Sequence, residues 1–179
     1  MQCPKCKSQE LKPTKIDEDL PALACENCEG SLLSLLYYRD WLETHHIFHQ
    51  ELEAIYPEVI EDTDTKTAIA CPKCSMLMRK YSVSGDVDNR IDLCVSCDEA
   101  WLDKGEWDLL KSLELGEKLP KVFTEQWQKK VRSEKLQTLK IEHLRKSVGD
   151  ADVVKAIEIK DWLKQHPQKA KIIQFIKSD

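Results

Sequence analysis

The stretch Cys3-Pro-Lys-Cys6 recurs as Cys71-Pro-Lys-Cys74, and this repeat decides the fold of the chain. Each copy is followed by a second pair of cysteines with the same spacing, after 18 residues in the first copy and 19 in the second. Two such pairs supply the four thiolates that a tetrahedral Zn²⁺ binds, because each pair forms a tight turn that directs two sulfurs at one point. We therefore predict two zinc ions, one held by Cys3, Cys6, Cys25 and Cys28 and the other by Cys71, Cys74, Cys94 and Cys97.

The cysteines allow two other interpretations. Eight cysteines suit the disulfide framework of a secreted protein, and a lone CxxC pair is typical of thiol oxidoreductases. Because Cys3 follows Met1 almost directly, we expect no signal peptide and a reducing, cytoplasmic compartment, which favours zinc over disulfides. No apolar run approaches the roughly 20 residues of a membrane span, so no membrane contact is expected.

The closed ligand sets indicate that the metals are structural. Catalytic zinc keeps three protein ligands and leaves a fourth position for water, whereas four cysteines leave no such opening. The sequence also contains no P-loop, GxGxxG, HExxH or Ser-His-Asp arrangement. We therefore predict a protein that is not an enzyme and expect no small-molecule substrate.

The predicted fold class is a small zinc-stabilised α+β protein. Two tandem four-cysteine zinc ribbons carry appended helices, and a helical C-terminal tail follows. A ribbon of about 45 residues buries little apolar surface, so metal binding must supply folding free energy. Each ribbon is expected to be a separate module that binds its metal independently. The predicted segments are a first ribbon with a long helix (1–57), an acidic linker (58–70), a second ribbon with a helix (71–116) and a basic helical tail (117–179).

Residue patterns place the secondary structure within these segments. Apolar residues spaced by three and four predict one helix over Ser31–Tyr56, ended by Pro57. Strands are expected in 10–16 and 23–25 and, as a β-hairpin, in 77–83 and 90–93. Asp103 and Glu106 have the spacing of a capping box for a helix over Lys104–Leu115, which Gly116 would end. Further helices are expected over 121–148, from Asp150 or Asp152 to Gln165, and from Pro167 to about Ile176.

The string Cys94-Val-Ser-Cys97-Asp-Glu-Ala-Trp101-Leu-Asp103-Lys-Gly105-Glu106, preceded by Cys71-Pro-Lys-Cys74, resembles the bacterial zinc ribbons called transcription-factor-IIB-type. The pattern of that family is CPxC, a hairpin and then CxxCxGxWLDxGEL. The resemblance is close over 71–110 and fair over 1–40, and it does not cover the chain after residue 117. It implies zinc binding by the eight cysteines and a role linked to transcription or translation.

Each copy of the repeat keeps half of that family's signature. The second copy has Trp101 and Asp103 but carries Glu99 where the family has glycine. The first copy keeps the glycine as Gly30 but has Leu32 in the tryptophan position and Ser34 in the aspartate position. These changes leave the cysteines untouched, but they alter any surface on which the family binds a partner.

Charge is unevenly distributed along the chain. Residues 1–116 carry 12 Lys and Arg and 23 Asp and Glu, a balance of −11, whereas residues 117–179 carry 15 and 9, a balance of +6. The basic tail is therefore the part of the chain expected to contact phosphate. The candidate contact residues, which could equally form a solvated helical face, are Lys129, Lys130, Arg132 and Lys135.

Other residues could also take part in binding. His45, His46 and His49 could hold a third metal, although a histidine packed on the apolar stripe explains His45 as well. Trp101 and Trp107 could stack on nucleic-acid bases, but their spacing favours a place in the core.

The sequence thus predicts a non-catalytic zinc-binding module that docks onto a macromolecular assembly and touches nucleic acid through residues 121–146. The alternative is a protein-binding adaptor that contacts no nucleic acid. A CxxC thiol oxidoreductase is a third hypothesis.

Overall fold

The computed structural model describes residues 1–45 and 65–178. It contains two compact units, residues 1–133 and residues 134–179, which we call the head unit and the distal unit. The head unit combines an antiparallel sheet with helices, whereas every element of the distal unit is a helix. The chain is thus of the expected mixed α+β class.

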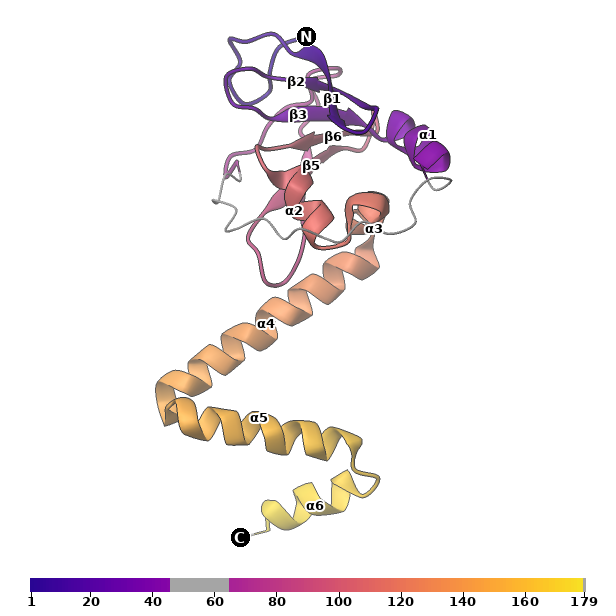
Figure 1. Cartoon of the computed structure of the whole chain (residues 1–179). Helices are drawn as coiled ribbons and strands as arrows, with labels where there is room; N and C mark the ends of the chain where they lie inside the picture. The colour runs from indigo at the N-terminus through magenta and orange to yellow at the C-terminus, as the bar shows by residue number, and fades with distance from the viewer. Residues whose placement is uncertain (46–64, 179) are drawn as a thin grey trace. The chain divides into compact units, whose positions relative to one another are not determined.

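The head unit is built on one six-stranded sheet with the order β1-β2-β3-β6-β5-β4, in which every neighbouring pair is antiparallel (Figure 1). The hairpin expected in the second copy is present as β4 and β5. The strands are β1 (Lys12–Asp17), β2 (Leu20–Ala24), β3 (Ser31–Ser34), β4 (Arg79–Ser82), β5 (Arg90–Cys94) and β6 (Glu99–Leu102).

The two copies of the repeat meet at the centre of this sheet. In the β3–β6 ladder Leu32 lies opposite Trp101, Ser31 opposite Leu102 and Leu33 opposite Ala100. Leu32 and Trp101 occupy the same position in the two copies, so a pseudo-twofold axis passes between them. The sequence led us to expect separate ribbon modules, but the cysteine-bearing segments share one continuous hydrogen-bonded sheet. The expected boundaries at residues 57, 70 and 116 remain predictions, and most of the linker lies outside the described residues.

The central strands are buried on both faces. Leu32 and Trp101 face a small core that also contains Leu11, Ile69 and Met78 and is continuous with the cysteines. Leu33, Ala100 and Leu102 face the larger core, which the helices of the head unit cover. This double burial explains why consecutive residues are apolar in both strands, Leu32 and Leu33 in β3 and Ala100 to Leu102 in β6, since successive side chains of a strand point to opposite faces.

The first helix is shorter than predicted. Residues 31–34 form β3 and not the start of a helix, because their amides and carbonyls pair with β2 and β6. Helix α1 spans Leu35–His45, and the remainder of the predicted helix lies outside the described residues. Tyr38 and Trp41 of α1 contact the ring of Trp107 at centroid distances of 6.5 and 6.1 Å, which fixes α1 on the larger core.

The capping box that begins the next helix forms only in part. Helix α2 spans Glu106–Ser112, and the carboxylate of Glu106 accepts a hydrogen bond of 2.8 Å from the amide of Asp103. The side chain of Asp103 instead binds other partners, and Gly105 occupies the N-cap position. The predicted glycine C-cap is also wrong, because Glu114 has the left-handed backbone and Gly116 begins a short 3-10 helix, η1 (Gly116–Lys118).

The helical region after η1 is broken once in the head unit. Helix α3 spans Leu119–Val122 and helix α4 spans Glu125–Val148, so the single helix predicted over 121–148 is interrupted at Phe123 and Thr124. Trp127 on α4 donates a hydrogen bond of 2.9 Å to the carbonyl of Val83. This bond joins the first turn of α4 to the end of β4.

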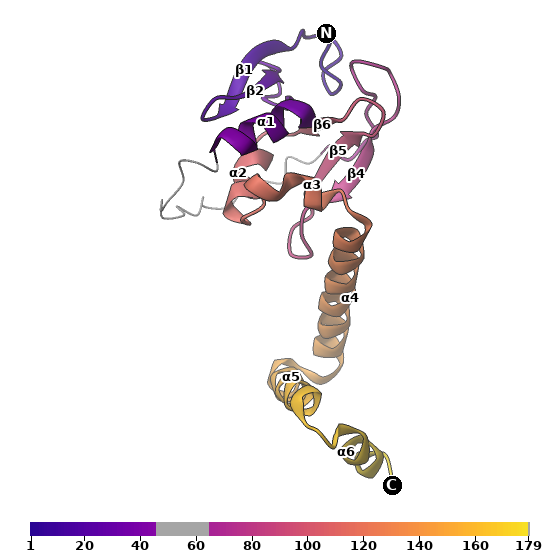
Figure 2. The same cartoon turned by 90° about the vertical axis from the view of Figure 1, so that its right-hand side faces the viewer.

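The distal unit contains the end of α4, α5 (Asp150–Gln165) and α6 (Lys169–Ile176) (Figures 1 and 2). The N-cap of α5 is Gly149, so neither Asp150 nor Asp152 caps the helix as predicted. Val153 is the one buried hydrophobic side chain among the described residues of this unit. The unit therefore leaves most of its apolar surface uncovered.

Candidate metal centres

The first cysteine cluster brings together all four ligands predicted for the first copy. The sulfurs of Cys3, Cys6, Cys25 and Cys28 lie within 4.8 Å of one another. The Sγ atoms of Cys3 and Cys28 are 3.7 Å apart, and those of Cys25 and Cys6 are 3.9 Å apart. All four are free thiols, and none forms a disulfide.

The second cluster repeats this arrangement. The sulfurs of Cys71, Cys74, Cys94 and Cys97 also lie within 4.8 Å of one another, and those of Cys74 and Cys94 are 3.5 Å apart. In both clusters the first cysteine of each of the two copies (Cys3 and Cys71) and the third (Cys25 and Cys94) are buried, whereas the other two are more exposed. Each cluster therefore sits at the edge of the small core.

The backbone of all four cysteine pairs has the same conformation. The residue after the second cysteine always has a left-handed backbone, with φ between 55° and 61°. Its amide donates to the carbonyl of the first cysteine at 2.8 to 2.9 Å. This tight turn places both sulfurs of a pair on one side, as a shared metal requires. The four residues are Lys7, Glu29, Ser75 and Asp98.

The geometry and chemistry of both clusters fit a tetrahedral thiolate site. With Zn–S bonds of about 2.3 Å, the sulfurs of a regular tetrahedron are about 3.8 Å apart. Three sulfur separations, of 3.5, 3.7 and 3.9 Å, agree with this edge length, and all four sulfurs of each cluster lie within 4.8 Å of one another. Four cysteine sulfurs would complete the coordination, so a metal held here has no position left for water or substrate.

Backbone amides and neighbouring thiols shift the pKa values of cysteines in both clusters. Burial acts to raise the pKa of Cys25, but the amides of Cys28 and Asn27 lower it to about 7. In the second cluster the amide of Met76 and the thiol of Cys97 lower the pKa of Cys74 to about 7. The thiol of Cys74, together with burial, raises the pKa of Cys97 to about 12. Gathered thiolates repel one another, and a bound cation would favour their ionised form.

The lysine inside each Cys-Pro-Lys-Cys turn forms an ion pair with a carboxylate of β6 or the residue just after it. Lys5 donates to Asp103 at 2.9 Å, and Lys73 pairs with Glu99. Both carboxylates are almost fully buried, with side chains 2% and 3% exposed. Each pair ties a cysteine turn to the centre of the sheet.

These pairs account for two of the departures from the ribbon signature. The pseudo-twofold axis relates Lys5 to Lys73 and Asp103 to Ser34. If the two copies were identical, Lys73 would therefore pair with an aspartate at position 34. Serine carries no charge, but Glu99 lies directly opposite Ser34 in the ladder and supplies the carboxylate. The sequence alone does not predict that Glu99 takes over the role of the missing aspartate, although a glutamate in the glycine position of the family pattern is a sign of it.

Asp103 connects three segments at once. Its carboxylate accepts hydrogen bonds from the Lys5 ammonium, from the Trp101 indole at 3.1 Å and from the Thr65 amide at 2.6 Å. Burial acts to raise the pKa of Asp103, but these donors outweigh it and hold the pKa below the ordinary value of 3.8. The side chain is therefore ionised at neutral pH.

The predicted contact residues Lys129, Lys130, Arg132 and Lys135 all lie on α4, and the first three are exposed. Lys129 forms an ion pair of 3.0 Å with Glu125. The ammonium of Lys130 lies 5.0 Å from the ring centroid of Trp127. Lys129 and Lys130 are thus engaged by residues of the helix itself.

The remaining predictions concern the histidines and tryptophans. His46 and His49, two of the three residues of the third metal site, lie outside the described residues. Trp101 and Trp107 are 0% and 7% exposed, which confirms their expected place in the core and leaves no face free to stack on a base.

The chain matches no family model, and neither a curated protein nor a solved structure is significantly similar to it. The resemblance to transcription-factor-IIB-type ribbons therefore rests on the motif residues alone. Among the described residues, no helix has both the length and the apolar character needed to cross a membrane.

Proposed function

We propose that the chain is a non-catalytic binding module in which two structural Zn²⁺ ions hold the head unit and the distal unit engages a protein partner. The observation that carries the proposal is the uncovered apolar surface of the distal unit. Its exposed large hydrophobic residues are Leu136, Leu139, Leu144, Val148, Val154, Ile159, Trp162, Ile173, Phe175 and Ile176. Exposed apolar surface on this scale is characteristic of protein or membrane contact.

The two metals support a structural and not a catalytic role. Four thiolates saturate a tetrahedral zinc, so the ion cannot activate water. A zinc ion with this ligand set contributes free energy of folding, which a small sheet with a limited core requires.

Nucleic-acid contact through α4 is the second candidate. It is favoured by Arg132, which is exposed and follows two further cations on the same helix. The engagement of Lys129 with Glu125 and of Lys130 with Trp127 weakens it, so we place the protein adaptor first. The expected link to transcription or translation rests on the resemblance and stays a prediction.

The test is affinity capture from an extract of the native cells, using the full-length, zinc-loaded protein as bait. The adaptor proposal expects a defined set of proteins that nuclease treatment does not remove. Capture that disappears with nuclease would place nucleic-acid contact first. A bait stripped of zinc is the control for the integrity of the head unit, and the proposal fails if neither protein nor nucleic acid is retained above that control.

A further inference from the structure

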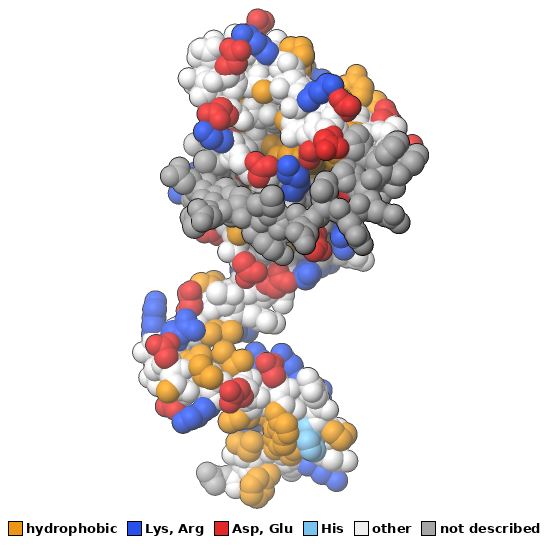
Figure 3. Space-filling view, viewed as in Figure 1, with side chains coloured by type: hydrophobic (Ala, Val, Ile, Leu, Met, Phe, Trp, Pro, Cys, Tyr) orange, Lys and Arg blue, Asp and Glu red, His pale blue; other side chains and the backbone are white. Residues whose placement is uncertain are grey.

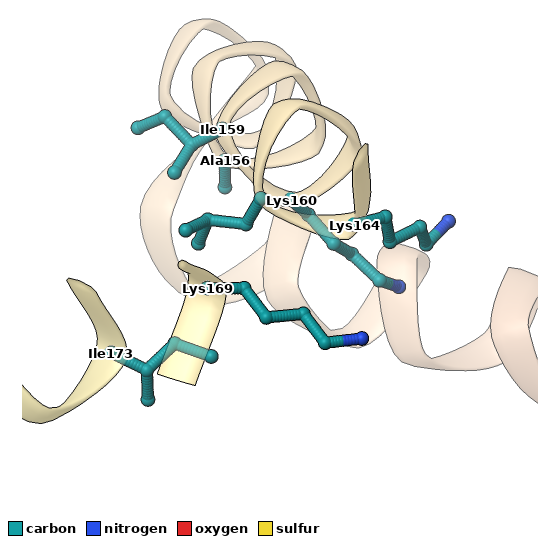
Figure 4. A pocket seen from close by; sticks show the side chains of 7 residues that line it. Ala156, Ile159, Lys160, Lys164, Lys169 and Ile173 are labelled. Atoms are coloured by element: carbon teal, nitrogen blue, oxygen red, sulfur yellow. The ribbon is translucent and has the colours of Figure 1, made fainter. Parts of the chain in front are cut away.

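The distal unit contains an apolar groove between α5 and α6 with a volume of about 570 Å³ (Figure 4). Ala156, Ile159 and Leu163 line it from α5, and Ile173 lines it from α6. The volume lies within the range of specific binding sites, and the walls are almost wholly aliphatic. Figure 3 shows the hydrophobic side chains of this region gathered on α5 and α6.

A cationic rim lies along one side of this groove. Lys160, Lys164 and Lys169 contribute to its lining, and their side chains extend away from Ile159 and Ile173 (Figure 4). Lys164 pairs with Asp161 at 2.9 Å, whereas Lys160 and Lys169 form no ion pair within the described part of the chain. Lys160 acts at longer range on the same carboxylate, so within the described residues Asp161 faces the ammonium groups of both Lys160 and Lys164.

The apolar wall of the groove continues along α6. Ile172, Ile173 and Ile176 follow Lys169 at positions three, four and seven, so they share one face of that helix. Ile176 is 59% exposed, and this surface extends beyond the residues that line the cavity. A ligand the size of a fatty acid would leave that surface uncovered, whereas a helix laid along the groove would cover it.

We propose that the α5–α6 groove binds an amphipathic helix of a partner protein that carries Asp or Glu beside its apolar stripe. This inference rests on the proposed function and names the chemical class of the partner. Apolar residues of the bound helix would pack against Ile159, Leu163 and Ile173, and its carboxylates would meet Lys160 and Lys169. This is the helix-in-groove mode, in which the apolar stripe gives affinity and the charges set register and orientation.

An anionic membrane is the competing occupant, and the position of Phe175 separates the two. Phe175 is 78% exposed and lies on the other side of α6 from Lys169 and Ile173. A membrane would take up exposed aromatic residues around the helix, whereas a helix in the concave groove does not reach Phe175. The position of the lysines along one side of the groove favours the helix, because they would meet carboxylates placed beside its apolar stripe.

The test uses the full-length, zinc-loaded protein and a display library of random peptides of 16 residues, the length of α5. We expect selected sequences with apolar residues at helical spacing and flanking Asp or Glu. Their synthetic versions should bind the double variant Lys160→Glu/Lys169→Glu at least about tenfold more weakly, because charge reversal turns attraction into repulsion.

Two variants provide matched controls. Lys155→Glu/Lys171→Glu makes the same change in net charge on the same two helices but away from the groove, and it should alter affinity by no more than about twofold. Phe175→Ser should leave peptide binding unchanged. Vesicles of phosphatidylcholine with phosphatidylglycerol should not compete with the peptides.

The inference is overturned if no peptide is enriched, if the selected peptides lack acidic residues or if both charge-reversal variants weaken binding equally. Vesicle binding that is lost in Lys160→Glu/Lys169→Glu and in Phe175→Ser would assign the surface to a membrane. Failure of this test is distinct from failure of the proposed function. Native partners captured equally by wild-type and groove variants would refute the groove but preserve the binding module.

Discussion

The indole of Trp101 occupies the space that Gly30 leaves empty. A Cβ atom at Gly30 would overlap the six-membered ring of Trp101. Gly30 belongs to the first copy of the repeat and Trp101 to the second. Each copy keeps one of these two signature residues and has another residue in place of the other. A second tryptophan at Leu32 would lie directly opposite Trp101 across the pseudo-twofold axis. The glycine of the first copy and the tryptophan of the second copy thus form a contact that joins the two copies.

Gly30→Ala is accordingly expected to destabilise the head unit. The added methyl group must displace Trp101, which is fully buried, and overpacking of this kind costs about 1–3 kcal/mol. Gly116→Ala is the matched control, because its Cβ would meet mainly the flexible Lys111 side chain at 3.1 Å. Urea unfolding of the zinc-loaded proteins measures both changes, and equal losses in the two variants would contradict the role given to the Gly30–Trp101 contact.

Each chain is expected to bind two zinc ions, and the two centres should be coupled. Cys94 ends β5, which pairs with β6, and β6 pairs with the strand β3 that follows Cys28. Cys94→Ser should therefore weaken zinc binding at the first centre as well, by about 5- to 150-fold, the usual range of coupling free energies. Metal analysis and chelator titration measure this effect, with Cys25→Ser as the reciprocal variant. A first centre of unchanged affinity would restore the independent modules expected from the sequence.

Asp103→Asn is expected to cost about 3 kcal/mol of unfolding free energy at pH 7, since it removes the buried carboxylate that binds the half-buried Lys5, the Trp101 indole and the Thr65 amide. The pKa of Asp103 is lowered in the folded chain, so its contribution is complete above 3.8 and declines as the pH falls through the folded pKa. Burial acts to lower the pKa of Lys5, but Asp103 raises it above 10.5, so the lysine contributes below that value. The stability difference should therefore stay constant between about pH 6 and pH 8. A difference that changes across this window would show that another group titrates with the pair.

Lys104→Gln, which breaks the exposed pair with Glu29, is the control and should cost less than about 1 kcal/mol.

The cysteine sets and the β4–β5 hairpin were predictable because local spacing encodes them. The two-residue spacing defines each turn, and alternating residues around a polar turn define the hairpin. The sequence predicts a helix over residues 31–34 because this short segment lies beside a helical pattern and is too short to show a period of its own. Their strand conformation depends on β6, which lies far away in the sequence.

The ion pairs of Lys5 and Lys73 escaped prediction for the same reason. Each joins a cysteine turn to a carboxylate that only the strand order brings near. Similarly, the roles of Gly30 and Glu99 are set by what lies opposite them across the β3–β6 ladder. A single sequence shows an exchanged residue but does not show the distant neighbour that compensates for it.

The choice between a protein adaptor and a nucleic-acid binder is open to a salt titration. A protein that contacts phosphates releases condensed counterions, so its affinity falls with salt by a slope of about 0.9 per contact on duplex DNA. Because Lys129 pairs with Glu125 and Lys130 lies over Trp127, we expect weak binding that is similar in wild type and in the variant with Lys129, Lys130, Arg132 and Lys135 all changed to Gln. Fluorescence anisotropy with a labelled duplex and a labelled single strand, from low to physiological salt, measures this.

Changing Lys155, Lys160, Lys164 and Lys171 to Gln gives a control with the same change in net charge on α5 and α6. A steep wild-type slope that falls by up to about four contacts only when the α4 residues are changed would establish the nucleic-acid function. Equal loss in both variants would instead indicate non-specific attraction to the basic end of the chain, because such attraction depends on net charge and not on position.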